Sequence, residues 1–160
     1  MIDLADRLMH HSKKRYKERK AENITQIVLH HSATKPNTLD GMRDVYAFAE
    51  YHVRELGWPG IGYHYVVAPD GTIYKTQANT TVSYHASGAN AYSLGVCMIG
   101  FFDKGDVPKE QREAALKLIR ELMGAYNIPA DKVIGHREVP APKSCPGTRV
   151  NMDTFRKELN

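Results

Sequence analysis

The chain has 160 residues, about the length of one ordinary domain, with 42% hydrophobic and 25% charged residues, as in a soluble globular protein. Its longest apolar run, residues 94–102, is too short to cross a membrane, and its first residues lack the basic start and apolar stretch of a signal peptide. The net charge is +4, and residues 1–22 carry seven basic and four acidic side chains, which is +3 of that total. We therefore expect a chain that is synthesised in the cytoplasm and binds no membrane.

The basic segment comes first in the chain. Leu4 and Leu8 lie one helical turn apart and begin a weak apolar stripe, which predicts a helix over residues 3–20. A basic helix offers a surface to an anionic polymer or to an acidic protein partner, and an ordinary solvated helix face is the alternative. We predict a basic helical extension at residues 1–22 and one domain at residues 23–160.

Strands and amphipathic helices alternate in this domain. In chain order the pattern predicts a buried strand over 24–30, a helix over 40–56, strands over 63–68 and 72–76, a long loop at 77–93, a strand over 94–101, a helix over 108–126, a short strand at 133–134 and a final helix over 154–159. Such alternation is typical of an α/β fold. We predict a central mixed β-sheet of about five strands flanked by helices.

Eight histidines are many for a chain of this length. Five of them stand where predicted strands meet loops: His30, His31, His64, His85 and His136. Catalytic and binding side chains often project from such positions. The other three, His10, His11 and His52, fall on predicted helices, where we expect solvent contact or ordinary packing.

One loop contains both His136 and Cys145. Pro140, Pro142 and Pro146 stiffen this loop, which reduces the conformational entropy lost when a metal binds. Two histidines and one thiolate would hold zinc and leave a fourth position open for water, as a hydrolytic site requires. The spacing of His136 and Cys145 is weak evidence by itself, because scattered histidines without a shared role fit it as well.

Four stretches carry a resemblance to a known family: Ile27–Thr34, Gly62–Tyr65 with Asp70–Thr72, Ser93–Cys97, and Gly135–Arg137 with Lys143–Pro146. By these stretches, which cover roughly residues 24–150, the chain resembles the zinc-dependent N-acetylmuramoyl-L-alanine amidases. That family includes phage lysozymes of the amidase type and shares its fold with the peptidoglycan-recognition proteins. The resemblance implies this fold and a zinc amidase catalytic domain at residues 23–160, and it implies nothing about residues 1–22.

The resemblance also implies a metal site with one Zn²⁺ per chain. His30, His136 and Cys145 match the family's zinc ligands. His31 is an alternative to His30, because neighbours on a strand point to opposite faces and only one of them can join the site.

Three further residues match functional positions of the family. Tyr63 matches its active-site tyrosine, which can orient the attacking water or accept its proton. Lys143 lies two residues before Cys145 and can stabilise the oxyanion formed at the amide carbonyl. His85 matches a loop histidine of the phage branch that can contact substrate, and a purely structural histidine is the alternative.

The implied activity is hydrolysis of the amide bond between N-acetylmuramic acid and L-alanine in bacterial peptidoglycan, by a monomeric phage or prophage endolysin. Without a signal peptide, the enzyme would reach the cell wall after release by a holin-type protein. One alternative is a peptidoglycan-binding module without catalysis, and another is a lysozyme that also binds a protein such as RNA polymerase. A third is a cysteine hydrolase with Cys145 as nucleophile and His136 as base. We expect no nucleic-acid partner, because no nucleic-acid motif accompanies the basic segment.

Overall fold

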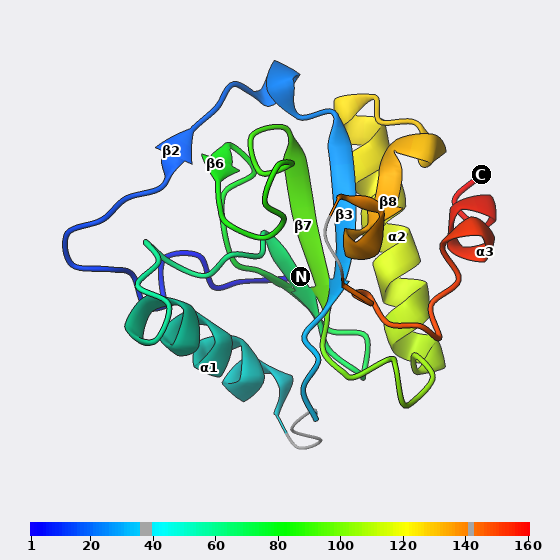
Figure 1. Ribbon diagram of the computed structural model, residues 1–160, viewed down its shortest axis with the longest axis horizontal. Helices are drawn as coiled ribbons and strands as arrows, with labels where there is room; N and C mark the ends of the chain where they lie inside the picture. Colours follow the sequence, from blue (N-terminus) through cyan, green and yellow to red (C-terminus); the bar gives the residue numbers. More distant parts are fainter. Residues whose placement is uncertain (36–39, 141–142) are drawn as a thin grey trace.

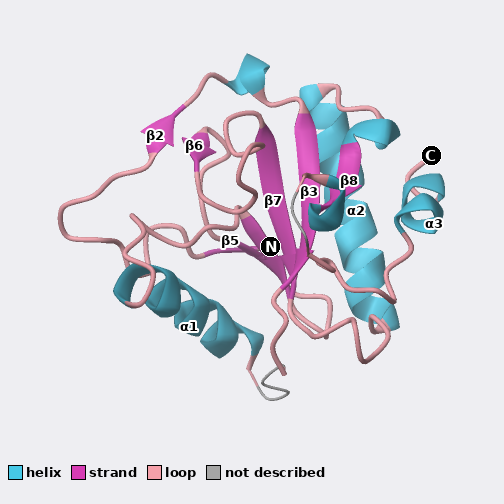
Figure 2. Ribbon diagram, in the orientation of Figure 1, coloured by secondary structure: helices cyan, strands magenta, loops and turns pink. Residues whose placement is uncertain are grey.

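The computed structural model describes residues 1–35, 40–140 and 143–160 and is built around a six-stranded sheet (Figure 1, Figure 2). In spatial order its strands are β1 (Ile2–Asp3), β5 (Ile73–Lys75), β4 (Tyr65–Val67), β7 (Ser93–Met98), β3 (Gln26–His31) and β8 (Val133–Gly135). β4 and β5 pair antiparallel, and the other neighbours pair parallel. The predicted α/β class with a central mixed sheet is confirmed, and β1 is the strand of this sheet that the sequence pattern did not predict.

Helices cover the sheet from both faces. α1 (Gly41–Arg54) lies on one face and α2 (Lys109–Tyr126) on the other, while α3 (Met152–Lys157) lies beside β8 (Figure 1). These helices confirm the predictions over 40–56 and 108–126, and α3 begins two residues before the helix predicted from residue 154. Within the described residues, none is long and apolar enough to cross a bilayer.

Side-chain alternation along β3 explains why both faces of the sheet are covered. Ile27 and Leu29 are buried in a cluster with Leu118 of α2, whereas Val28 is buried on the opposite side. Central parallel strands are apolar on both faces for this reason. The same alternation sends His30 to the face of Val28 and His31 to the face of Leu29.

Capping residues set the ends of the helices. The Asp40 side chain accepts a hydrogen bond from the backbone N–H of Arg43 (3.3 Å) at the start of α1, and Pro108 directly precedes α2. Asn127 ends α2 in the left-handed conformation, with φ of 54°. Because these signals are local in sequence, the predicted boundaries of α1 and α2 lie close to the observed ones.

The helix predicted over residues 3–20 is wrong. Residues 2–3 form β1, and Lys17–Glu18 form a short strand, β2, that pairs antiparallel with β6 (Thr81–Val82), a strand inside the segment 77–93 that was predicted as a loop. Leu4 and Leu8 are buried as predicted, but no apolar stripe continues beyond them. A helix over the later residues would bury little, and short helices depend on such burial.

Contacts with the rest of the domain take the place of that helix. The backbone N–H of His11 donates to the carbonyl of Pro59 (2.9 Å), and that of Arg19 donates to the carbonyl of Thr80 (2.8 Å). Three short 3-10 helices complete the described chain: η1 (Ala21–Asn23), η2 (Ala130–Lys132) and η3 (His136–Glu138).

Candidate functional site

The site lies at the edge of the sheet where the parallel strands β3 and β8 end. His30 and His31 are the last residues of β3, and His136 directly follows Gly135, the last residue of β8. The strand register places Leu29 opposite Gly135, so His30 and His136 come next on neighbouring strands. Their ring centroids are 4.6 Å apart. The parallel pairing thus joins two histidines that are far apart in sequence.

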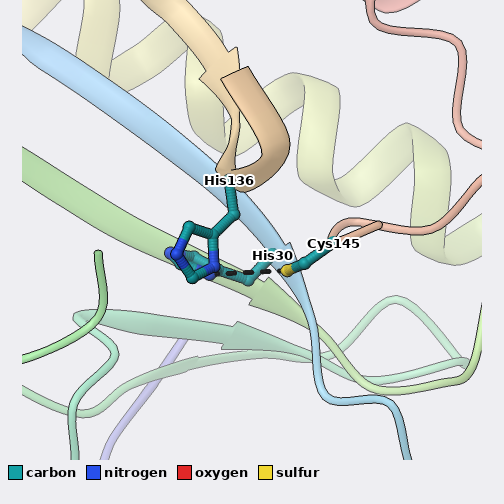
Figure 3. Close-up of side chains that lie close together, drawn as sticks. All are labelled: His30, His136 and Cys145. Atoms are coloured by element: carbon teal, nitrogen blue, oxygen red, sulfur yellow. Dashed lines mark hydrogen bonds between the residues drawn. The ribbon is translucent and has the colours of Figure 1, made fainter. Parts of the chain in front are cut away.

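Cys145 completes a compact group of three potential metal ligands (Figure 3). One ligand atom from each of His30, His136 and Cys145 lies within 4.8 Å of the other two. The Cys145 Sγ is 3.6 Å from Nδ1 of His30. Tetrahedral zinc with bonds of about 2.05 Å to nitrogen and about 2.3 Å to sulfur places those atoms roughly 3.5 Å apart. The donor set and its spacing therefore fit a tetrahedral metal ion.

The two neighbouring histidines of β3 have different surroundings. Nδ1 of His31 accepts a hydrogen bond from the backbone N–H of Phe102 (3.1 Å), and its ring contacts the rings of Phe101 and Phe102. The structure therefore brings His30, and not His31, into the three-residue group.

Arg137 holds the loop that carries Cys145. Its backbone N–H donates to the carbonyl of Cys145 (2.7 Å). Its guanidinium donates to the carbonyls of Ser144 (3.3 Å), Gly147 (2.9 Å) and Val150 (2.5 Å). One side chain thus ties three carbonyls of the loop to the turn that begins with His136.

Asp103 holds the same loop through its carboxylate. It accepts hydrogen bonds from the backbone N–H of Thr148 and from the hydroxyl of Ser144, both at 2.8 Å. These two bonds lower the pKa of Asp103. The position of Cys145 is therefore fixed by charged side chains on two other segments.

Burial keeps the candidate ligands uncharged. It lowers the pKa of His30 well below the usual value, and the neighbouring His85 and His136 lower it further. Burial and the charge of Lys143 lower the pKa of His136 to about 4. Burial raises the pKa of Cys145 to about 11. Neutral imidazoles have a lone pair for a metal, whereas a cysteine nucleophile needs a thiolate beside an imidazolium, so these shifts disfavour the cysteine-hydrolase alternative.

Tyr63 stands beside the ligand group, just before β4. Its ring centroid is 5.4 Å from that of His30, and its backbone carbonyl accepts a hydrogen bond from the hydroxyl of Thr76 (2.5 Å). Burial, together with the nearby Cys97 and Cys145, raises its pKa well above the usual value. The phenol therefore remains protonated and can donate a hydrogen bond.

A pocket of about 480 Å³ contains every predicted site residue. It is lined by His30, His31, Ala33, His52, Trp58, Tyr63, Tyr84, His85, His136, Lys143, Ser144 and Cys145. Lys143 is exposed and lines this pocket, and burial and the charge of Lys143 both lower the pKa of His136. The structure thus brings the three candidate ligands, Tyr63, Lys143 and His85 together in one cavity.

Sequence patterns did not predict the aromatic wall of the pocket. The ring centroids of Trp58 and Tyr84 are 5.8 Å apart, and Tyr16 of the N-terminal segment packs behind Tyr84 at 4.8 Å. His52, expected in solvent or ordinary packing, is buried at 4.7 Å from the Trp58 ring. The one available signal was Trp58, the chain's single tryptophan, at the turn after the helix.

His85 and His64 are both bonded within the protein. Nδ1 of His85 is 3.0 Å from Nε2 of His30, and Nε2 of His85 is 3.1 Å from the Ser93 hydroxyl oxygen. Nδ1 of His64 accepts from the backbone N–H of Gly95 (3.0 Å), and its Nε2 donates to the carbonyl of Thr81 (2.7 Å). His64 is not among the three grouped ligands, as predicted, and a contact of His85 with substrate stays a prediction.

Comparisons with known sequences extend over most of this fold. A family model described as N-acetylmuramoyl-L-alanine amidase matches residues 20–148. An endolysin of Enterobacteria phage K11 is 34% identical over 132 residues, which cover 79% of this chain and 83% of the phage protein. An endolysin of Escherichia phage T7 is 34% identical over 128 residues, which cover 78% of this chain and 82% of the phage protein.

Solved structures share the same architecture. The N-acetylmuramoyl-L-alanine amidase LysC from Clostridium intestinale URNW superposes with a TM-score of 0.78 at 28% identity, covering 99% of this chain and 95% of that one. Wild-type Drosophila PGRP-LB superposes with a TM-score of 0.77 at 30% identity, covering 92% of this chain and 88% of that one.

Proposed function

The chain belongs to the N-acetylmuramoyl-L-alanine amidase family, and we propose that it uses zinc to hydrolyse the amide bond between N-acetylmuramic acid and L-alanine in bacterial peptidoglycan. The observation that carries this proposal is the convergence of ligand atoms of His30, His136 and Cys145 within 4.8 Å of one another, in the pocket that Tyr63, His85 and Lys143 also line. Three protein ligands suit a catalytic metal site, because a fourth tetrahedral position is left for water or substrate.

Zinc is the metal that suits this donor set best. A thiolate and two imidazoles are softer than the oxygen ligands that magnesium and calcium prefer. Because burial raises the pKa of Cys145 to about 11, its thiol must release a proton when the cation binds. Bound zinc supplies a Lewis acid that polarises an amide carbonyl and makes hydroxide available near neutral pH.

Tyr63 and Lys143 would act on different reacting groups, Tyr63 on the attacking water and Lys143 on the carbonyl oxygen. Burial opposes the phenolate of Tyr63, which supports orientation of the attacking water by the phenol rather than removal of its proton. The ammonium of Lys143 would stabilise the negative charge that develops on the carbonyl oxygen. A charge placed before the reaction begins needs little rearrangement during it, so its effect falls mainly on the rate.

The relatives that are named endolysins support a role for this chain as a phage or prophage endolysin. It would then act as a monomer on the cell wall, after release by a holin-type protein. Residues 1–22 could contact an anionic surface, or a protein such as RNA polymerase, mainly through those basic side chains that are not already hydrogen-bonded to the domain. Lys14 already donates to the carbonyl of Gly57 (2.7 Å), and Arg19 donates to that of Asn79 (2.8 Å).

A binding role without catalysis is the second candidate. Wild-type Drosophila PGRP-LB, whose name denotes peptidoglycan recognition, shares the fold. Recognition alone does not require a third metal ligand, and the thiol of Cys145 beside both histidines therefore favours catalysis.

Digestion of purified peptidoglycan tests the proposal. We expect new α-amino groups of alanine without new reducing sugar ends, loss of this release with a strong zinc chelator, and recovery when zinc is added back. New reducing ends would identify a glycosidase and refute the proposal. Binding to the walls without any release would favour the recognition module.

A further inference from the structure

A chain of hydrogen-bonding groups leads from a backbone carbonyl to the candidate metal site. The Ser93 Oγ is 2.7 Å from the carbonyl of Ala89 and 3.1 Å from Nε2 of His85. Nδ1 of His85 is 3.0 Å from Nε2 of His30. Nδ1 of His30 then faces the Cys145 Sγ at 3.6 Å.

The first member of this chain determines the direction of every bond. A carbonyl can only accept, so the single hydroxyl proton of Ser93 goes to Ala89. The remaining contact of Ser93 then requires a proton on Nε2 of His85. The His30 and His85 side chains are both buried, which favours neutral rings with one N–H each. Nδ1 of His85 is therefore an acceptor, and Nε2 of His30 must donate to it.

This order leaves one nitrogen of His30 with a free lone pair. Its Nε2 carries the proton, so its Nδ1 is unprotonated and faces Cys145. A zinc ligand must present a lone pair of this kind, and the proton on its other nitrogen is usually held by a neighbouring acceptor.

Further contacts fix the position of the His85 ring and of its backbone. A Cβ added to Gly95 would lie 2.7 Å from Cγ of that ring, so only glycine leaves room for it. Oδ1 of Asn90 accepts hydrogen bonds from the backbone N–H groups of His85 (3.0 Å) and Ala86 (2.8 Å). The ring is therefore placed against β7 by Gly95, and the backbone that carries it is held by Asn90.

We propose that Ser93 and His85 are positioning residues that hold His30 in the tautomer whose Nδ1 binds zinc. This inference rests on the proposed function, because it concerns the same metal site. It gives His85 a role through His30, beyond the substrate contact expected from the sequence.

Two variants of the same shape separate hydrogen bonding from packing. His85→Asn keeps an acceptor near the position of Nδ1, whereas His85→Leu has a similar size and no acceptor. The zinc dissociation constant of each folded protein is measured by competition with a chromophoric chelator. We expect His85→Leu to bind zinc about 10- to 100-fold more weakly than the wild type, and His85→Asn to recover most of that loss.

His52→Leu is the matched control, because it removes another buried histidine that lines the same pocket, one whose Nδ1 accepts from the backbone N–H of Gly62 and not from a candidate ligand. Its zinc affinity should equal that of the wild type. Equal affinities for wild type and His85→Leu would overturn the role of His85 while leaving the metal site intact. A wild-type chain that binds no zinc would refute the proposed function, and this role with it.

The tautomers can also be read directly in the unaltered protein. Long-range proton–nitrogen correlation spectra of the zinc-loaded chain should show His85 protonated on Nε2, and His30 protonated on Nε2 with Nδ1 bound to metal. A proton on Nδ1 of His85 would overturn the inference even if the leucine variant failed to fold. A role for His85 in packing alone would not determine which ring nitrogen carries the proton.

Discussion

Replacing Arg137 by methionine should destabilise the loop that presents Cys145. The guanidinium donates to three carbonyls of this loop, at 3.3 Å to Ser144, 2.9 Å to Gly147 and 2.5 Å to Val150. Methionine keeps most of the aliphatic stem but removes every donor. The three carbonyls would then have to find water or remain without a partner.

The expected magnitude follows from these contacts. A hydrogen bond to a charged group contributes about 1.5–3 kcal/mol, and the lower end applies because Arg137 is only half-buried. Counting the two shorter bonds at this lower end and neglecting the one at 3.3 Å gives a loss of about 3 kcal/mol in the free energy of unfolding. Zinc affinity should fall as well, since a less ordered loop must be fixed again when Cys145 binds the metal.

Arg149→Met is the control, because Arg149 lies on the same loop but pairs with Asp106 at the surface. The two side chains are 51% and 84% exposed, and such an ion pair contributes about 0–1 kcal/mol. Urea unfolding of both variants and of the wild type, in chelator, measures the difference without the contribution of zinc. If Arg137→Met and Arg149→Met lose the same free energy to within about 1 kcal/mol, the guanidinium does not hold this loop.

Three further predictions concern the chemistry and the buried histidines. Cys145→Ser should lose tight zinc binding and amidase activity while its far-ultraviolet circular dichroism stays unchanged; a full zinc content after dialysis would contradict this. Tyr63→Phe and Lys143→Met should each lower kcat by roughly 10²- to 10³-fold with little change in zinc content, and a change confined to KM would exclude a role in the chemical step. Burial lowers the pKa of His52 to about 4 and that of His64 to about 3, below the value of about 6.5 in an unfolded chain. The unfolded state therefore binds more protons than the folded state between pH 6.5 and 4. As the pH is lowered through this window, the free energy of unfolding should fall by up to about 1.4 kcal/mol per pH unit for each histidine. Urea titrations across this range should show a shallower pH dependence in His52→Gln, and an unchanged slope would mean that His52 is not buried as a neutral ring.

Local signals in the sequence predicted most of the fold, but they did not predict the strand pairing of the N-terminal segment. The long strands and helices from residue 24 onward have apolar periodicities of their own, and flanking residues such as Asp40 before α1 and Pro108 before α2 mark where the helices begin, whereas the short strand β6 lay in a predicted loop. The N-terminal segment instead depends on β5 and β6 for its pairing. Leu4 and Leu8 have the spacing of a helix, but their burial comes from an extended chain that packs against the domain.

The site could not be predicted from the spacing of residues alone. The spacing between His136 and Cys145 alone did not identify a metal site, and His30 joins them only because β3 and β8 run parallel and end together. The family resemblance supplied that pairing. The aromatic wall of Trp58 and Tyr84 has no comparable motif, because its members come from two separate turns and meet only in the folded chain.

Strand β7 has an alternation of large and small residues that is related to the position of the site. Leu94, Val96 and Met98 alternate toward α2 and fill that side of the core. The intervening positions, Ser93, Gly95 and Cys97, are small although the strand is fully buried. A buried strand that is large on one face and small on the other leaves space above its small face. Here the His85 ring lies against Gly95 and Tyr63 lies near Cys97, while His30 is the register partner of Cys97 on the neighbouring strand. In β7, the small residues at alternate positions therefore mark the face on which the site is built.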